Sequence, residues 1–201
     1  MTATRSARSL AALIALIAAF SIGLQFSINV MELGSVSASV AQMTRYFTIL
    51  TNLMVMALMG AIALGWRAPR LLILAMVTAI IGVGIIYHVA LAHLLDPQGW
   101  EIVGDQGVHT VVPVLSAIWW VLFATSRKGD WRRLHWVLVW PLVYSAYALV
   151  RGNATGLYPY PFMDLNQISV AILSRNFVVL LLAFWVIGAI MQGAVQLRRG
   201  R

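Results

Sequence analysis

Residues 71–95 read LLILAMVTAIIGVGIIYHVALAHLL, and this run of 25 residues contains no aspartate, glutamate, lysine or arginine. An α-helix advances about 1.5 Å per residue, so about 20 mostly apolar residues are needed to cross the hydrocarbon layer of a membrane. The whole chain agrees with this, because 61% of its 201 residues are hydrophobic and only 10% are charged. Such a composition leaves too few charged side chains to cover a soluble domain. The sequence therefore predicts an integral membrane protein.

Five further stretches are similar to residues 71–95 in apolar character. They are residues 10–30, 47–65, 108–125, 134–150 and 168–197. The connections are short, as at Ala68-Pro69 and Asp96-Pro97-Gln98-Gly99, and short connections make consecutive helices antiparallel neighbours. We therefore expect an all-α fold, a polytopic bundle of six transmembrane helices that forms a single domain over residues 1–201.

The charged residues indicate the direction in which the predicted helices cross the membrane. Eleven of the 14 basic residues fall on one side, namely Arg5, Arg8, Arg67, Arg70, Arg127, Lys128, Arg132, Arg133, Arg198, Arg199 and Arg201. Five of the six acidic residues lie in the connections on the other side, namely Glu32, Asp96, Glu101, Asp105 and Asp164. Basic segments stay in the cytoplasm, so both termini are expected there. The net charge of +8 is thus explained by orientation in a membrane, and no nucleic-acid binding is predicted.

Polar side chains within the apolar stretches gather in the halves that are predicted to lie near the outer face. On the second stretch, Thr44, Thr48, Thr51 and Asn52 are spaced so that they share one helical face. The other stretches contribute Gln25, Asn29, Tyr87, His88, His93, His109, Tyr144, Tyr147, Arg151, Arg175 and Asn176. Polar groups in hydrocarbon are costly unless they are paired or hydrated. We therefore expect these side chains to surround a cavity that opens to the outer face or the outer leaflet.

Arg175 lies about two turns inside the sixth stretch, where a charged side chain needs a partner. Asp164 and Glu32 are candidate ion-pair partners, and a lipid carboxylate or phosphate held by the guanidinium is the alternative. No metal site or other cofactor is predicted. The chain has no cysteine, and the spacing of His88 and His93 places them on different faces of a helix.

Three segments resemble those of a known family. They are RYFTILTNL at residues 45–53, GVHT at residues 107–110 with Pro113 after it, and YPYPF at residues 158–162. These elements resemble, in order and in position between helices, the bacterial six-pass Pr-six-Pr membrane proteins, which look related to the animal androgen-induced and androgen-dependent multipass proteins. The resemblance runs from the second stretch to the sixth. It implies a six-helix protein of the bacterial plasma membrane.

The resemblance also implies an activity, because the animal proteins are threonine hydrolases that cleave fatty acid esters of hydroxy fatty acids. Their threonine lies on the second helix and their histidine opens the fourth. Thr48 and His109 match these two residues, with Thr51 as the alternate nucleophile. The animal threonine is followed three residues later by an aspartate, and this chain departs from that pattern with Thr51 and then Asn52.

In such a reaction the threonine hydroxyl is a weak nucleophile, and His109 is the expected base that takes its proton. The residues expected to line the cavity are Asn52, Tyr87, His88, Tyr147, Arg175 and Asn176. The two asparagines and Arg175 are candidates for stabilising the oxyanion, and Tyr87 or His88 for orienting the base or a water molecule. Membrane lipids are the expected partners, with a fatty acyl ester as the substrate that enters from the outer leaflet.

Two other classes of function remain open on the sequence. A non-catalytic lipid-binding or assembly protein would use Thr48 and His109 only to hydrogen-bond each other, and it predicts bound lipid without turnover. A small-molecule transporter would use the same cavity and predicts that the cavity continues to the cytoplasmic side. Against transport, no inverted repeat is visible and no carboxylate is expected at mid-membrane depth.

Overall fold

The computed structural model describes residues 4–125 and 130–199, and over these ranges every regular element is helical. The α-helices are α1 (Arg5–Leu33), α2 (Val36–Met43), α3 (Phe47–Ala63), α4 (Arg70–Ile86), α5 (Trp100–Gln106), α6 (Val112–Phe123), α7 (Val139–Thr155) and α8 (Val170–Arg199). π-Helical segments follow α4 at Tyr87–Leu91 and join α5 to α6 at Gly107–Val111. Segments of 3-10 helix are Ala92–Leu94, Asp130–Leu138 and Pro161–Met163. The prediction of an all-α fold is confirmed.

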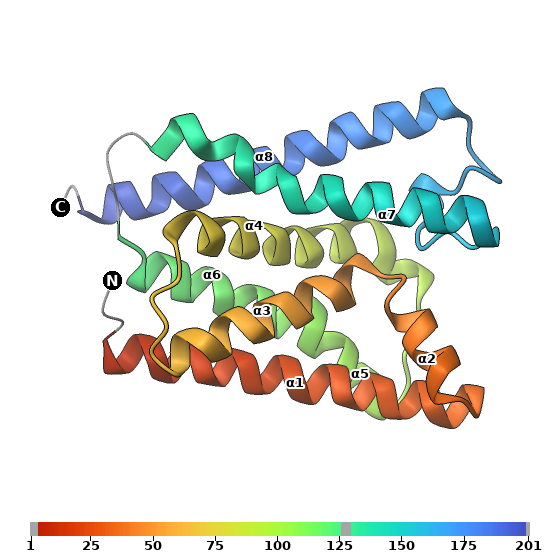
Figure 1. Ribbon diagram of the computed structural model, residues 1–201, viewed down its shortest axis with the longest axis horizontal. Coiled ribbons are helices and arrows are strands. Elements are labelled where there is room, and N and C mark those ends of the chain that lie inside the picture. The colour runs from red at the N-terminus through yellow and green to blue at the C-terminus, as the bar shows by residue number, and fades with distance from the viewer. Residues whose placement is uncertain (1–3, 126–129, 200–201) are drawn as a thin grey trace.

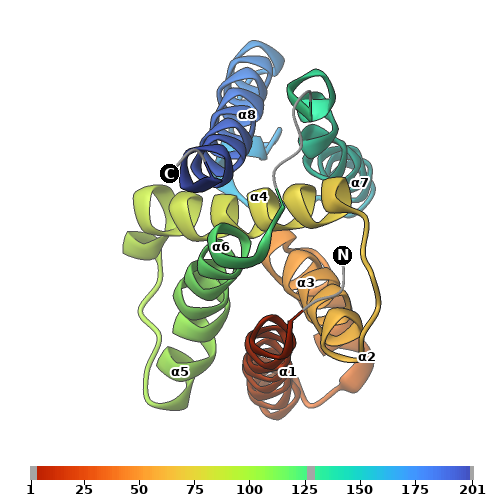
Figure 2. The same ribbon diagram turned by 90° about the vertical axis from the view of Figure 1, so that its left-hand side faces the viewer.

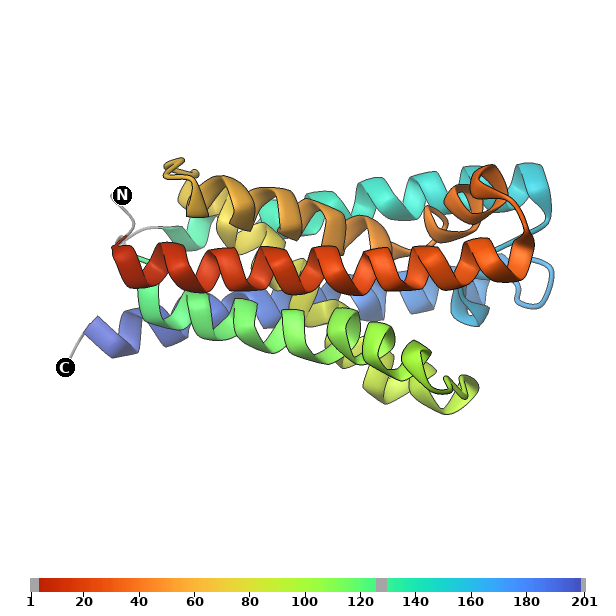
Figure 3. The same ribbon diagram turned by 90° about the horizontal axis from the view of Figure 1, so that it is seen from below.

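The helices run roughly along one long axis, and the start of α1 and the end of α8 lie at the same end of the bundle (Figure 1). Figure 2 shows α4 passing between two groups of helices, with α7 and α8 on one side and α1, α3, α5 and α6 on the other. Figure 3 shows α1 along its whole length, between α3 and the α5–α6 rod. The π-helical segment before α6 contacts α1, α3 and α4. Residues of α1, α3 and α4 therefore meet at the segment that joins α5 to α6.

Capping groups explain where the first two helices begin and end. Thr4 Oγ1 accepts a hydrogen bond from Ala7 N–H at 3.2 Å and caps α1. Gly34 ends this helix with a φ of 62°, a left-handed conformation that glycine adopts without a Cβ clash. Ser35 then caps α2 by accepting from Ala38 N–H at 3.3 Å. This turn folds α2, which the hydropathy of the sequence does not predict as a separate helix, back against α1.

Four helical rods are long and apolar enough to cross a membrane, and they comprise Arg5–Leu33, Arg70–Leu94, Trp100–Phe123 and Val170–Arg198. A fifth is counted if α2 and α3, which are bent by 92° at their junction, form one span. The described residues thus contain four or five candidate spans, fewer than the six expected from the sequence. The count falls short because α3 and α7 have 17 residues each. Their length of about 26 Å is less than the hydrocarbon thickness of about 30 Å.

The outward faces of the long helices are apolar. On α8, Val178, Leu182 and Ile190 each expose more than half of their surface, and on α1 the same is true of Leu16 and Phe20. Contiguous apolar faces of this kind are unusual on a soluble monomer, whereas hydrocarbon chains solvate them well. The helices therefore have the length and the surface of membrane-spanning helices.

The fourth predicted span begins too late. The sequence predicts residues 108–125, whereas the helical rod runs from Trp100 to Phe123. Glu101, Asp105 and Gln106 lower the local hydropathy, so this part of the helix has the sequence pattern of a connection. In the structure Asp105 is only 7% exposed and lies within the rod. The earlier start of this helix places the Asp105 carboxylate in the interior of the bundle, where the sequence predicts an external loop.

Basic side chains at the end of the bundle that carries both termini bind backbone carbonyl groups of neighbouring helices. Arg8 Nε donates to Ala63 O at 2.8 Å, which joins the start of α1 to the end of α3. Arg198 donates to Ala124 O at 3.0 Å, which joins the end of α8 to the end of α6. Basic residues at the start of α1 and at the end of α8 therefore lie at the same end of the bundle. Arg127, Lys128 and Arg201 lie outside the described residues.

Candidate functional site

Thr48 lies in the first turn of α3, directly after the sharp bend out of α2. The residue before the helix is Tyr46, whose backbone is extended (φ −91°, ψ 134°). Thr48 is 8% exposed, and its hydroxyl oxygen lies 3.2 Å from Nε2 of His109. The structure therefore brings the threonine and the histidine that the sequence singled out within hydrogen-bond distance of each other.

His109 is held by Asp105, which precedes it by one helical turn. Nδ1 of His109 lies 2.9 Å from Asp105 Oδ1 and 3.1 Å from the Asp105 backbone oxygen. Both of these oxygens are acceptors, so Nδ1 carries the proton and donates it. A neutral imidazole then has its lone pair on Nε2, where it accepts a hydrogen bond from the Thr48 hydroxyl. Hydroxyl, imidazole and carboxylate thus follow one another in the order found in hydrolase triads.

Tyr87 completes the contacts around Asp105 and His109. Its hydroxyl donates to Asp105 Oδ2 at 2.6 Å, so both carboxylate oxygens have a partner. Its ring stacks on the His109 imidazole, with centroids 3.8 Å apart and an interplanar angle of 9°. The hydrogen bond orients the carboxylate, and the stacking fixes the plane of the imidazole. Thr48, Tyr87, Asp105 and His109 are called the polar cluster below.

Close packing of backbones sets the position of His109. Both His109 and Tyr87 lie in π-helical segments, which are frequent at functional sites. A Cβ on Gly84 would lie 2.9 Å from the His109 backbone oxygen, and a Cβ on Gly107 would lie 2.7 Å from Ser21 Cβ. Because Cβ atoms essentially never approach other atoms within 3.0 Å, the helices can pack this closely only with glycine at these two positions.

Asn52 links the helix of Thr48 to the segment that carries His109. Its fully buried amide group donates from Nδ2 to Thr48 O at 2.9 Å and to Val108 O at 3.2 Å. Both amide protons are therefore committed to backbone carbonyls. Asn52 holds the two halves of the polar cluster together, and its amide is not directed at the Thr48 hydroxyl as an oxyanion donor would be.

Three hollows meet at the polar cluster. The first, called the chamber, has a volume of about 300 Å³. The chamber is lined by the polar cluster with Gln25, Tyr46, Ile49, Leu91, Leu94, Leu95, Pro159, Tyr160 and Pro161. The second, called the aromatic groove, is narrow at about 60 Å³ and lies between α3, α4, α7 and α8. The third, called the lateral groove, has a volume of about 380 Å³ and lies between α4 and α6, with His88 and His109 in its wall.

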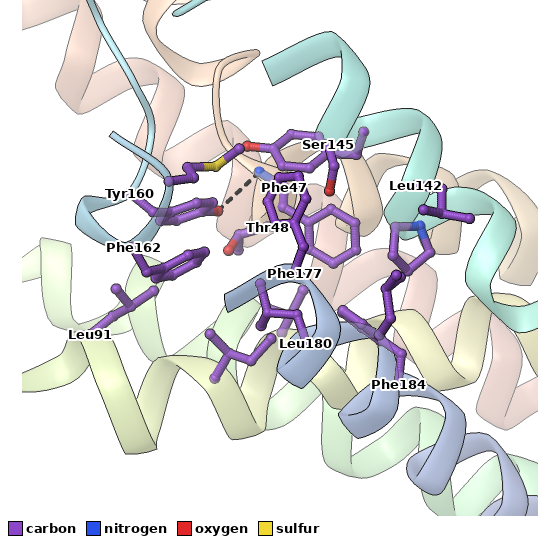
Figure 4. A pocket seen from close by; sticks show the side chains of 16 residues that line it. Phe47, Thr48, Leu91, Leu142, Ser145, Tyr160, Phe162, Phe177, Leu180 and Phe184 are labelled. Atoms are coloured by element: carbon purple, nitrogen blue, oxygen red, sulfur yellow. Dashed lines mark hydrogen bonds between the residues drawn. The ribbon is translucent and has the colours of Figure 1, made fainter. Parts of the chain in front are cut away.

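Thr48 lies part-way along the aromatic groove. Figure 4 shows Thr48 with Tyr160 and Phe162 on one side of it and Leu142 and Phe184 on the other. Apart from the hydroxyl groups of threonine, serine and tyrosine, its walls are aliphatic and aromatic side chains. Its apolar walls favour an alkyl chain over a polar ligand, and its small volume admits only a short part of such a chain.

Two residues that the sequence places in the cavity serve instead in helix packing. Thr51 is fully buried and accepts a hydrogen bond from Trp140 Nε1 at 2.9 Å. The Tyr147 hydroxyl donates to Thr44 O at 3.1 Å. Neither lines any of the three hollows. The rotation of their helices turns both side chains towards a neighbouring helix.

Arg175 and Asn176 also lie outside the three hollows. Arg175 is exposed and donates to Asn176 Oδ1 at 3.3 Å, and Asn176 Nδ2 donates to Phe162 O at 2.8 Å. Asp164, one of the expected partners of Arg175, instead accepts from Gln167 Nε2 at 2.7 Å. The structure therefore places Arg175 on the surface of α8, away from the polar cluster.

His88 lies beside the polar cluster without joining it. Thr110 donates its hydroxyl proton to Gln106 Oε1 at 2.7 Å, so its oxygen is free to accept from His88 Nε2 at 2.9 Å. This contact keeps His88 in the wall of the lateral groove.

Asp105 is the functional candidate that the sequence analysis assigned to the wrong place. The sequence offered a signal, because Asp105 and His109 are four residues apart and would share one face of a helix. The hydropathy pattern hides this signal, because it places Asp105 in the connection before residue 108. Tyr160 belongs to the YPYPF segment, and the sequence alone does not indicate that its side chain lines two of the hollows.

The chain matches no family model, no curated protein and no solved structure. What the polar cluster can do therefore follows from its own geometry and chemistry.

Proposed function

We propose that this protein is a membrane-embedded ester hydrolase in which Thr48 is the nucleophile, His109 is the general base and Asp105 orients the base. The observation that carries the proposal is the unbroken chain of contacts from Thr48 through His109 to Asp105, at 3.2 Å and 2.9 Å. A hydroxyl nucleophile requires such a base, and the base requires a group that fixes its tautomer. The resemblance to the animal threonine hydrolases supports the same roles for Thr48 and His109.

The proposed reaction has two stages. In the first, Thr48 Oγ1 attacks the ester carbonyl carbon, its proton passes to His109 Nε2, and the electrons of the C=O double bond move to the carbonyl oxygen. The intermediate collapses to an acyl-threonine when the C–O bond to the alcohol breaks, and the leaving oxygen takes the proton from Nε2. In the second stage a water molecule gives a proton to Nε2 and attacks the acyl-threonine. Collapse then releases the carboxylic acid and returns the proton to Thr48.

The hollows favour a lipid ester as the substrate. Thr48 lines both the aromatic groove and the chamber, whereas His109 lines the chamber and the lateral groove and is absent from the wall of the aromatic groove. The leaving alcohol has to be close to His109 because it takes its proton from Nε2. This places the acyl chain in the aromatic groove and the alcohol part in the chamber or the lateral groove. An ester with an apolar chain on each side of the carbonyl fits this division.

The same proposal includes a position in the membrane. We place six crossings in the chain, with α3 and α7 as the two short ones, and both termini in the cytoplasm. The gathering of basic residues at the end of the bundle that carries both termini supports this orientation. Short spans are tolerated when the bilayer thins locally or when flanking residues reach the interface. The polar cluster then lies in the outer half of the membrane, which the family resemblance implies is a bacterial plasma membrane.

A fluorophosphonate probe tests the proposal, because it reacts covalently with activated hydroxyl groups. The full-length protein in detergent is expected to be labelled, and Thr48→Ala and His109→Ala are each expected to reduce labelling by at least about 10³-fold. Thr51→Ala is the matched control, since it removes a hydroxyl from the same helix outside the hollows. Equal labelling of the wild-type protein and Thr48→Ala would contradict the proposal.

Turnover distinguishes the proposed hydrolase from the two other classes of function. Release of free fatty acid from a fatty acyl ester, measured by mass spectrometry and abolished in Thr48→Ala, is the expected result. Lipid that copurifies with the wild-type protein without being cleaved would instead indicate a lipid-binding protein. Flux of a small solute in proteoliposomes that does not depend on Thr48 would indicate transport.

A further inference from the structure

The proposed reaction needs a hydrogen-bond donor for the oxyanion, and the residues named so far do not supply one. His109 Nε2 has to accept the proton of the nucleophile, and the hydroxyl proton of Tyr87 is donated to Asp105. Both amide protons of Asn52 are bound by backbone carbonyls. Arg175 is exposed and lies outside the hollows. A donor must therefore come from another part of the cavity wall.

The hydroxyl of Tyr160 lies next to Thr48, where the chamber and the aromatic groove meet. Both side chains line both hollows, and Figure 4 shows their hydroxyl groups close together. The Tyr160 oxygen accepts a hydrogen bond from Phe47 N–H, the first N–H group of α3, at 3.0 Å. With this bond made, the phenolic proton is directed towards another acceptor.

The ring of Tyr160 is held in place by its neighbours. It stacks on Phe162, with centroids 5.1 Å apart and an interplanar angle of 9°, and it meets Tyr46 edge to face at 6.0 Å. Pro159 and Pro161 flank it in the sequence and restrict the backbone on both sides. A donor fixed before the substrate arrives needs no reorganisation during the reaction, which is the property that makes oxyanion stabilisation effective.

We infer that Tyr160 is a catalytic residue whose O–H donates to the carbonyl oxygen of a bound ester and stabilises its negative charge when Thr48 attacks. The inference rests on the proposed hydrolase function. The electrons of the C=O double bond move to the oxygen that Tyr160 contacts, the Thr48 proton passes to His109, and Tyr160 keeps its own proton throughout. Donation from Phe47 N–H polarises the phenol and strengthens its O–H as a donor.

The Tyr160 hydroxyl is protonated at neutral pH. Burial raises the pKa of Tyr160 to about 12, although the hydrogen bond from Phe47 N–H acts in the opposite direction. The hydroxyl is therefore a hydrogen-bond donor at neutral pH.

The test compares Tyr160→Phe with the wild-type protein on an ester and on the matching thionoester, in which sulfur replaces the carbonyl oxygen. Sulfur is a poor hydrogen-bond acceptor, so an enzyme with a working oxyanion donor prefers the ester. Tyr160→Phe is expected to lower kcat by about 10²-fold with little change in KM, and to lower the preference for ester over thionoester by a similar factor. Tyr147→Phe, which removes a tyrosine hydroxyl outside the hollows, is expected to change neither quantity.

A second variant separates the donor role from the structural bond to Phe47. A fluorotyrosine at position 160 keeps the ring and the oxygen that accepts from Phe47 N–H, and it is expected to support turnover within about threefold of wild type. Thr48-dependent turnover with an ester preference that is unchanged in Tyr160→Phe would overturn the role of Tyr160 and leave the hydrolase standing. Absence of any Thr48-dependent turnover in the wild-type protein would overturn both.

Discussion

Replacing Gly107 by alanine tests whether the close approach of α1 to the segment of His109 shapes the site. The new Cβ would overlap Ser21 Oγ and lie 2.7 Å from Ser21 Cβ. Rotation of the Ser21 side chain moves the oxygen but not the Cβ, so the overlap has no relief within the existing packing. Either α1 moves away or the π-helical segment moves, and His109 lies only two residues further along that segment.

The size of the effect follows from two opposing contributions. Forcing an extra methyl group into a packed interface costs about 1–3 kcal/mol, and alanine in place of glycine in a helix returns about 1 kcal/mol. Because the overlap involves both atoms of the Ser21 side chain, we expect a net destabilisation of about 2 kcal/mol, or roughly a 30-fold lower ratio of folded to unfolded protein. A displacement of His109 by about 1 Å is expected to lower the reactivity of Thr48 by about 10²-fold.

The assay is a double-mutant cycle with Ser21→Gly, read by thermal unfolding in detergent and by fluorophosphonate labelling of Thr48. With glycine at position 21, the nearest atom of that residue to the new Cβ is its Cα at 4.0 Å, an ordinary van der Waals distance. The double variant is therefore expected to recover both stability and labelling, with a coupling free energy of about 2 kcal/mol. Strictly additive effects of the two substitutions would refute the packing argument.

Three further predictions concern the contacts of the polar cluster. Asp105→Asn is expected to lower the labelling rate of Thr48 by about 10³-fold with little change in unfolding temperature. An amide can donate to Nδ1 of His109 and so favour the tautomer with its proton on Nε2, which cannot accept the proton of Thr48. Unchanged labelling would exclude Asp105 from the site. Tyr87→Phe keeps the ring stacked on His109 and removes one hydrogen bond to the Asp105 carboxylate, so the labelling rate of Thr48 is expected to fall about tenfold. If the two residues act together, the same substitution should not lower the labelling rate further in an Asp105→Asn background. Asn52→Leu is expected to lower the free energy of unfolding by about 1 kcal/mol, because the loss of two hydrogen bonds is partly offset by removing the buried Oδ1, for which the described residues provide no partner. A labelling rate equal to that of the wild-type protein would show that Asn52 does not position Thr48.

Local composition is enough to predict the helical class and the general placement of the long helices. The reason is that the bilayer imposes a local rule, in which about 20 apolar residues in succession are required whatever their neighbours are. Residues 71–95 satisfy that rule, and the structure has a continuous helical rod over Arg70–Leu94. The rule is an average over a window, however, so it began the fourth helix at residue 108 instead of Trp100, extended the second stretch to residue 65 although α3 ends at Ala63, and placed the fifth stretch at 134–150 although α7 covers Val139–Thr155.

The composition of the site was decided by the tertiary structure. Thr48 and Thr51 have the same side chain and lie three residues apart, yet one faces His109 and the other faces Trp140. The rotation and tilt of a helix, and so the direction in which each side chain points, depend on how closely neighbouring backbones pack, and that is a property of pairs of helices rather than of one segment. For the same physical reason, the packing of α5 against α1 and the contact with Tyr87 bring Asp105 into the polar cluster, whereas Arg175 lies on the exposed surface of α8.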